Sequence, residues 1–497
     1  MNESPLKFPK QADENRIQKY THYDKLYDGE HFDAFSIKSS GEVAKAYKKL
    51  RYIVANFAGL TSHVMADMLF GEALTIDLEN EKSQKYVDSL VHQNDLINQL
   101  YESAIINSRR GDDVFKIRIG KRNPLDNFAK PEIIIEQVGA NIYFPQFDSK
   151  AARNVTTQDI IATTFMDGNN CYLHKETHQP GVIYHEVFKY DPKSQTLISN
   201  EDPKRFGFME VEDTKIKRSL IFHVPNYRDG RFWGPSDYKD LESLFFALNN
   251  RLTKTDNILD KHSDPILAVP PGVIDEEGKV KKEALGMFEV DNENPGFNKP
   301  EYIVWNANLE SAFKQVDKIL DMLFMFSEIA PATMGADKQG QAESGRALKF
   351  KLLSTIRKRN RKISYYDMAI KQMLQTSMEL SLAWGIGTTD GLKPGEIEVP
   401  SLKWGDGIIN DQVEMTDIAV KRVDAGLSTR ADEIARLDDV SIDKAKEKVK
   451  EIDEETEPTL PEITNNTNGN AGNTPPPNQN QNANQNQNQN EPQPAGR

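Results

Sequence analysis

The sequence has 497 residues, 38% of them hydrophobic, with a formal net charge of −14 and a single cysteine, Cys171. This length allows about three domains, and the lone cysteine excludes an intrachain disulfide. The acidic balance argues against tight, sequence-independent wrapping of nucleic acid but not against a surface past which nucleic acid slides. The chain has neither an apolar run of about eighteen residues nor the apolar core of a signal peptide. We therefore expect a soluble protein made in a cytoplasm, with no contact with a membrane.

The first region, residues 1–235, is predicted to mix helices and strands. Apolar residues at helical spacing predict a short helix within Tyr20–His31 that ends near Gly29, and longer helices at Tyr47–Phe70 and Leu90–Ser108. Gly29 is expected to follow the end of the first helix and Gly71 the end of the second. Alternating apolar residues then predict strands at Val114–Ile119, Glu132–Gln137, Ile160–Met166, Ile183–Tyr190 and Ser219–Val224.

His174 and His178 form a candidate metal pair. We expect them to flank a hairpin turn, and no third ligand stands out in the sequence around them. A structural zinc site needs four protein ligands and a catalytic one needs three. We therefore predict no metal site at this histidine pair.

The middle region predicts two helices that bracket an insert. Ser236 is an N-cap candidate after Gly234–Pro235, and the first helix is expected at residues 236–262. The second is expected at residues 308–330. The insert between them has strand-like runs at Ile266–Val269, Met287–Val290 and Tyr302–Trp305. This pattern indicates two paired helices that carry a small β-rich tip.

A small, polar segment, PATMGADKQGQAES, follows at residues 331–344 and is predicted to be a loop. Gly335 and Gly340 enclose four residues, as in a phosphate-binding loop, but Gln341 stands where that motif requires lysine, and no strand precedes it. Nor does the sequence contain a G-x-S-x-G or H-E-x-x-H motif. We therefore predict no catalytic centre and no cofactor.

A long helix is predicted from Glu343 to Trp384, with apolar positions at helical spacing and no proline. Roughly forty residues at 1.5 Å each give a rod of roughly 60 Å. The heptad pattern breaks at Arg359 and Asn360, which favours a strut over a simple coiled coil.

The first half of this rod is strongly basic, with no acidic residue between Ser344 and Tyr366. Its cations are Arg346, Lys349, Lys351, Arg357, Lys358, Arg359, Arg361 and Lys362. They can form a solvated face or pair with acids of a neighbouring subunit, or they can contact a polyanion such as DNA. A solvated face or pairing with a neighbouring subunit is slightly favoured over contact with DNA, because the basic residues fall on almost every face of the helix.

The C-terminal part predicts a strand at Glu396–Pro400, then helices at Asp411–Asp424, Arg430–Leu437 and Ser441–Glu455. From residue 456 the composition changes to asparagine, glutamine, proline and glycine. Such a segment cannot bury enough apolar surface to fold, so residues 456–497 are predicted to be disordered.

The order of these parts resembles a tailed-bacteriophage portal protein, of the type found in siphoviruses of Gram-positive hosts. The resemblance is carried by WGPSDYKDLESLFFALNNRLTKTDNILDKHSDPIL (residues 233–267), ESGRALKFKLL (343–353) and GLSTR (426–430). LYDGEH (26–31) and LFGEALTID (69–77) agree with it. The resemblance extends over roughly Tyr20 to Glu455 and does not include the asparagine- and glutamine-rich tail.

The resemblance implies an α+β, mainly helical fold divided as portal proteins are. Its expected parts are a wing (1–235 and 386–409), two stem helices (236–262 and 308–330), a clip (263–307), a channel loop (331–344), a long tunnel helix (345–385) and a crown (410–455).

The resemblance also implies a homo-oligomeric ring, usually twelve-fold, at one capsid vertex of the virion, assembled in the host cytoplasm. Double-stranded DNA would pass through it, and terminase, capsid or scaffold and head-completion proteins would bind it. Asp337, Lys338, Gln339 and Gln341 are the expected DNA-channel loop residues. The candidate contacts with DNA or a neighbouring subunit are Arg346, Lys349, Lys351, Arg357, Lys358 and Arg361.

Two other classes of protein fit less well. A DNA-processing enzyme subunit would need a metal–carboxylate cluster or a phosphate loop, and neither stands out. A head–tail connector or coiled-coil scaffold is the other alternative, but connectors are generally shorter and a scaffold would not need the β-rich insert.

Overall fold

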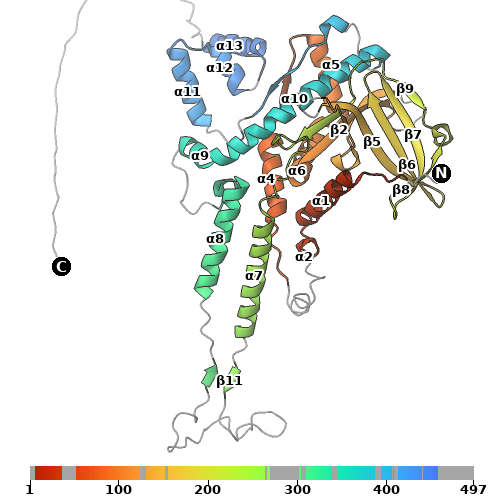
Figure 1. The fold of residues 1–497 in the computed structure, drawn as a ribbon. Coiled ribbons are helices and arrows are strands. Elements are labelled where there is room, and N and C mark those ends of the chain that lie inside the picture. Colours follow the sequence, from red (N-terminus) through yellow and green to blue (C-terminus); the bar gives the residue numbers. More distant parts are fainter. Residues whose placement is uncertain are drawn as a thin grey trace, which may run out of the picture. The chain divides into compact units, whose positions relative to one another are not determined.

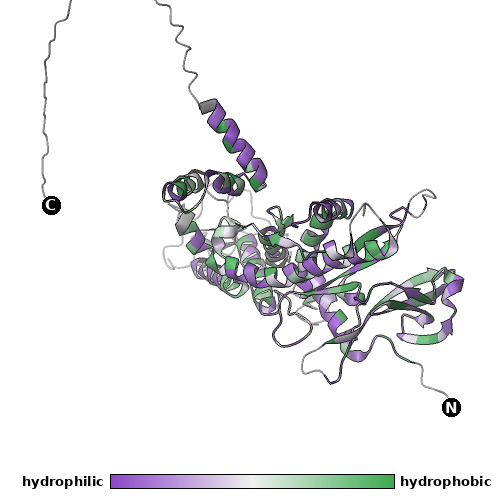
Figure 2. Cartoon of the chain, turned by 90° about the horizontal axis from the view of Figure 1, so that it is seen from above, coloured by the Kyte–Doolittle hydropathy of each residue, from purple (hydrophilic) through white to green (hydrophobic). Residues whose placement is uncertain are grey.

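The computed structural model describes residues 6–35, 52–123, 125, 130–150, 155–263, 266–268, 301–303, 309–336, 345–386, 393–405, 407, 412–438 and 440–456. The chain divides into two compact units, Met1–Asn410 and Asp411–Arg497. The fold mixes helices and sheets, as the sequence predicts (Figure 1). No helix among the described residues is long and apolar enough to cross a membrane, and Figure 2 shows hydrophilic residues interspersed along the helices.

The N-terminal helices differ from prediction mainly in where they start. Helix α1 (Gln11–Tyr27) begins nine residues before the predicted start, and α2 (His31–Ala34) follows the turn at Gly29. Helix α4 (Phe57–Phe70) begins ten residues late. The N–H groups of Ile53 and Ala55 donate to Thr253 and Asn249 of a later helix, and Asn56 caps α4. Tertiary contacts therefore hold residues 53–56 out of the helix.

Two helices replace the predicted helix Leu90–Ser108. Helix α5 (Glu81–Gln93) is capped by Asn80, and α6 (Leu96–Arg110) follows a break at Asp95, which has a left-handed φ of 49°. Asparagine and aspartate tolerate this conformation better than other non-glycine residues. The break turns the chain so that α6 packs beside α4.

A three-stranded antiparallel sheet has the order β10-β2-β3 and lies against these helices. It contains β2 (Asp112–Gly120), β3 (Glu132–Gln137) and β10 (Ile221–Pro225), so all three predicted strands are confirmed. The largest core cluster includes Phe115 and Ile117 of β2 and Ile133 and Ile135 of β3, whereas Val114 of β2 packs in a separate cluster.

A six-stranded antiparallel sheet has the order β4-β5-β6-β7-β8, with β9 paired to β7. Its strands are β4 (Gln146–Phe147), β5 (Thr156–Asp167), β6 (Asn170–Gln179), β7 (Val182–Asp191), β8 (Thr196–Glu201) and β9 (Val211–Asp213). Strands β5 and β7 were predicted, but β6 was missed because its polar residues obscure the alternation. Short 3₁₀ turns lie at Ala140–Ile142 and Pro203–Phe206.

The predicted helix pair is present. Helices α7 (Glu242–Ser263) and α8 (Leu309–Ser327) lie side by side and lead to the strand pair β11 (Ile266–Ala268) and β12 (Glu301–Ile303) (Figure 1). Helix α7 starts six residues later than predicted, because residues 237–241 form turns. The predicted strand Met287–Val290 lies outside the described residues.

The long helix forms in two consecutive pieces, α9 (Gly345–Lys351) and α10 (Leu353–Trp384). Its buried stripe joins the largest core cluster through Tyr366, Ile370 and Met373. The strand predicted at Glu396–Pro400 is wrong: a 3₁₀ turn (Pro394–Glu396) precedes β13 (Ser401–Lys403), which pairs with β1 (Thr75–Asp77).

The second unit contains α11 (Gln412–Asp424), α12 (Arg430–Leu437) and α13 (Ile442–Thr456), close to the predicted bounds. Thr429 caps α12 reciprocally with Asp432, as the GLSTR turn indicates. The predicted disorder of the tail falls outside the described residues, apart from Thr456 at the end of α13.

Candidate functional site

The helical rod formed by α9 and α10 is the element on which most predicted functional residues lie. Leu352 separates its two helices, but backbone hydrogen bonds continue across it. The N–H of Leu352 donates to Leu348 and that of Ile356 to Leu352, both at 3.0 Å. The two pieces are therefore connected by helical hydrogen bonding.

Three of the basic residues on α10 point into the protein. Lys358, Arg359 and Lys362 are each at most 6% exposed. Lys358 Nζ lies 3.1 Å from Asp237 Oδ1, and Lys362 Nζ lies 2.8 Å from Asp237 Oδ2. Lys358 also donates to the carbonyl of Ser327 at 2.9 Å. The buried carboxylate therefore joins two lysines of α10 to the segment that leads into α7.

The charged groups of this cluster shift one another's pKa values. Burial alone would raise the pKa of Asp237, but the ammonium groups of Lys358 and Lys362 outweigh it and lower that pKa well below its usual range. Burial lowers the pKa of Lys362 to about 8, against the opposing effect of Asp237. Ser108 donates a further hydrogen bond to Asp237 at 2.7 Å. The cluster is thus a buried structural ion pair.

Arg359 joins α10 to two other segments. Its guanidinium donates to the carbonyls of Met68, in α4, and Gly405, just after β13. Arg361 lies on the exposed side and pairs with Glu328. The chain itself therefore supplies partners for both cations.

The structure divides the predicted contact residues into three groups. Lys358 is buried and paired inside the chain, which argues against its predicted contact with DNA. Lys349 and Arg357 are exposed, and Lys351 is half-buried. Arg346 lies in α9, but its side chain is outside the described residues, as are the loop residues Asp337, Lys338, Gln339 and Gln341.

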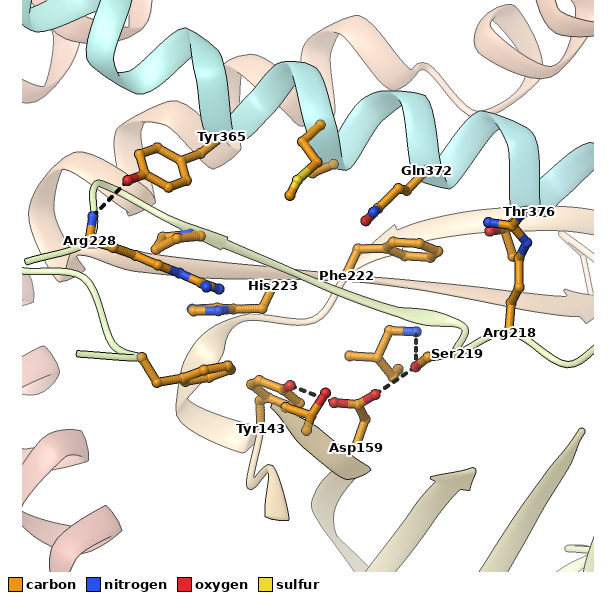
Figure 3. Close-up of a pocket in the computed structure, with 16 residues that line it drawn as sticks. Tyr143, Asp159, Arg218, Ser219, Phe222, His223, Arg228, Tyr365, Gln372 and Thr376 are labelled. Carbon is orange, nitrogen blue, oxygen red and sulfur yellow. Dashed lines mark hydrogen bonds between the residues drawn. The ribbon is translucent and has the colours of Figure 1, made fainter. Parts of the chain in front are cut away.

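A cavity of about 380 Å³ lies between α10 and β10 (Figure 3). Tyr143 and Ser219 each donate to Asp159 at 2.6 Å, so both carboxylate oxygens have a partner. Tyr365 of α10 accepts a hydrogen bond from the N–H of Arg228 at 3.1 Å. Burial, helped by Asp159, raises the pKa of Tyr143 well above its usual value. These polar groups bind one another, which is the pattern of a structural network.

The sequence-based prediction for His174 and His178 needs correction. Both lie on β6, and the turn to β7 comes after Gln179, so they do not flank it. Instead, His174 approaches Glu176 on its own strand and His185 on β7. Sequence reasoning missed these neighbours because it missed β6. The alternation H-x-E-x-H was the available signal, since alternate residues of a strand share one face.

Comparison with known proteins identifies the family. Residues 6–461 match the family model described as "Phage portal protein, SPP1 Gp6-like". No curated protein sequence matches the chain. A solved structure described as "Neck of native GTA particle computed with C12 symmetry" aligns with 87% of this chain and 95% of its own, at 10% identity and a TM-score of 0.39. Because the family match spans nearly the whole sequence, the chain belongs to the family of phage portal proteins.

Proposed function

We propose that this protein forms a closed, twelve-fold ring at one capsid vertex and serves as a conduit for double-stranded DNA during packaging and ejection. The match of residues 6–461 to the portal family carries this proposal. In it, the ring is also the docking platform for terminase and later for head-completion proteins. The protein is then a virion component, assembled in the cytoplasm of a bacterial host; the Gram-positive siphovirus type remains part of the proposal.

The proposed parts of the ring subunit follow the elements. The paired helices α7 and α8 would be the stem, and residues 263–307, which include β11 and β12, the clip. The pairing of β1 with β13 supports a wing built from residues 1–235 and 386–409, since it joins these two stretches. Residues 410–455 would be the crown, supported by a second compact unit that begins at Asp411.

The channel lining would come from residues 331–344 and the outer face of the rod. We propose that Asp337, Lys338, Gln339 and Gln341 approach DNA, together with Arg346, Lys349, Lys351 and Arg357. Lys358 is left out because it is buried, and Arg361 keeps Glu328 as a partner. A chain with a net charge of −14 would repel phosphates along most of its length, so a few cations could guide DNA without trapping it.

The proposed ring is passive and is not an enzyme. The sequence lacks a phosphate-binding loop, so the force for packaging would come from a separate ATPase. ATP hydrolysis measured on the purified ring should equal the buffer background. Hydrolysis that co-purifies with the ring and survives removal of other proteins would overturn this part of the proposal.

Native mass spectrometry of the purified full chain, combined with negative-stain images, tests the ring itself. We expect a closed ring of about a dozen subunits with a central hole. If ring closure needs a partner, the same measurement after addition of the capsid or scaffold protein should give it. A stable dimer without a hole in both conditions would overturn the proposal and favour a DNA-processing role for the basic helix.

A further inference from the structure

Four titratable side chains share one face of the six-stranded sheet. His174, Glu176 and His178 alternate along β6, so they project to the same side. His185 on β7 pairs in register with Glu176, which places it on that face as well. Nothing in the proposed conduit function uses this cluster.

The donor atoms of the cluster lie close together, and His174 offers a different ring nitrogen to each of its two neighbours. His174 Nε2 lies 3.0 Å from His185 Nδ1, and His174 Nδ1 lies 3.8 Å from Glu176 Oε1. One donor atom from each of these three residues lies within 4.8 Å of the others. The side chain of His174 is 5% exposed and those of His185 and Glu176 are 10% and 14% exposed, so the cluster is shielded but still reachable.

The surrounding groups orient the ligands. His185 Nε2 lies 3.4 Å from Glu212 Oε2, and a carboxylate on the far nitrogen is the usual support for a metal-binding histidine. Glu176 Oε2 accepts from Lys116 at 2.7 Å and lies 3.2 Å from His178 Nε2, which leaves Oε1 on the side of His174. The ring of Phe208 stacks on His174, with the ring centroids 3.9 Å apart.

There is also room beside the cluster. A cavity of about 120 Å³ is lined by two of the three residues, Glu176 and His185, and by Glu212, Lys116 and Arg118; His174 does not line it. A water molecule needs roughly 10–15 Å³ of such space, so the cavity can hold the water molecules that complete the coordination of an ion beside Glu176 and His185.

We propose that His174, Glu176 and His185 bind a divalent transition-metal ion, and that zinc is the ion whose chemistry fits best. Two imidazole nitrogens and one carboxylate oxygen form a recognised zinc ligand set that leaves a fourth position for water. At Zn–N distances of about 2.1 Å, tetrahedral coordination separates two nitrogens by about 3.4 Å. The histidine nitrogens therefore need to move apart by only a few tenths of an ångström. His174 would bind through Nε2, so the carboxylate of Glu176, whose Oε1 now lies 3.8 Å from Nδ1 of the same ring, would have to turn toward the ion. Lys116 contacts the other carboxylate oxygen, so it supports Glu176 without occupying its metal-facing atom.

Such an ion would link β6 to β7 beside the β9 edge. The ligands come from both strands of this hairpin, and Glu212 of β9 holds one of them in place. A ligand that binds the folded chain and not the unfolded chain stabilises the folded chain by mass action. Zinc should therefore raise the unfolding temperature.

The test uses the full chain, stripped with a chelator and dialysed into metal-free buffer. Isothermal titration with zinc chloride should give about one ion per chain, with micromolar or tighter affinity. Elemental analysis after gel filtration should give the same ratio, and cobalt(II) should produce the visible absorption of a protein-ligated, four-coordinate ion. His174→Gln and His185→Gln should each weaken zinc binding by at least tenfold.

His92→Gln is the matched control, because His92 is an exposed histidine near the end of α5, away from this sheet. It should bind zinc as the wild type does. Far-UV circular dichroism of each variant without metal shows whether it is folded. Lys116→Met gives a second test that keeps all three ligands and should retain one zinc per chain. The proposal is overturned if the wild type binds no zinc, or if folded His174→Gln and His185→Gln retain wild-type affinity.

Discussion

At the scale of single residues, the most consequential side chain is a buried aspartate. Asp237 pairs with two lysines of α10 in a region where all three side chains are at most 8% exposed. The basic sequence of α10 suggests a surface for phosphates, whereas part of that charge is used inside the fold. Whether a lysine or arginine of α10 is buried decides whether it pairs inside the fold or is exposed to phosphates. The sequence of α10 alone does not reveal which of them are buried.

Replacing Asp237 with asparagine should therefore destabilise the protein strongly. The substitution leaves two buried ammonium groups without a counter-charge, and breaking a buried pair costs about 3–5 kcal/mol. Urea unfolding of the unassembled chain measures the loss. Glu328→Gln is the control, because it removes the exposed partner of Arg361 and should cost less than about 1 kcal/mol. Equal effects of the two substitutions would contradict this interpretation.

The same pair predicts a dependence on pH. The pKa of Asp237 is lowered in the folded protein, so its contribution to stability is full above its unfolded value of 3.8 and is lost as the pH falls below that value. The difference in free energy of unfolding between wild type and Asp237→Asn should narrow by about 1 kcal/mol from about pH 7 to about pH 3. Denaturant unfolding of both proteins at each pH checks this. A difference that stays constant or widens at acidic pH would contradict it.

At the scale of elements, the structure keeps most predicted helices and strands and moves several of their ends. Apolar periodicity identified α7, α8 and the rod, which are amphipathic, and also α4, which is buried on nearly every face. The late start of α4 follows from hydrogen bonds between residues 53–55 and α7, nearly 200 residues away in the sequence. The spacing of apolar residues along a short stretch cannot predict a hydrogen bond to a residue so far away in the sequence.

The pairing of α7 with α8 depends on a shared apolar cluster that includes Phe245, Leu248, Ile319 and Leu323. Leu323 is fully buried, so Leu323→Ala should lower the free energy of unfolding by about 2–5 kcal/mol. Phe313→Ala on the same helix is the control, since Phe313 is 51% exposed and should matter little in the unassembled chain. Thermal or urea unfolding distinguishes the two. A larger effect from Phe313 would show that α8 packs in a different orientation.

The turn between α6 and β2 requires glycine at position 111. Gly111 has a φ of +92°, and a Cβ there would lie 2.4 Å from the carbonyl oxygen of Gly234. Gly168 also has a positive φ, but a Cβ there would have no atom within 4 Å. Gly168→Ala should cost about 1–2 kcal/mol through backbone strain alone, and Gly111→Ala should cost clearly more. The unfolding midpoints of the two variants test this difference. Equal midpoints would mean that the backbone at Gly234 can move away from the added Cβ without a loss of stability.

At the scale of the whole molecule, the family match points to a subunit of a larger assembly. Portal proteins are components of the virion, and the described helices include none that could span a membrane. Each subunit carries a net charge of −14, so a ring of such subunits is strongly acidic. This fits the proposed conduit, because a channel that bound phosphates along its length would hold DNA in place.

The sequence alone determined the family, the order of the main elements and the helix pair that brackets residues 264–308. These follow from local periodicity, capping residues and motifs, which each short stretch carries by itself. Tertiary structure decided which cations of α10 are buried, where α4 begins, and that His174, Glu176 and His185 come together across two strands. Each of these depends on partners far away in the sequence or on an adjacent strand, and only the folded chain brings them within bonding distance.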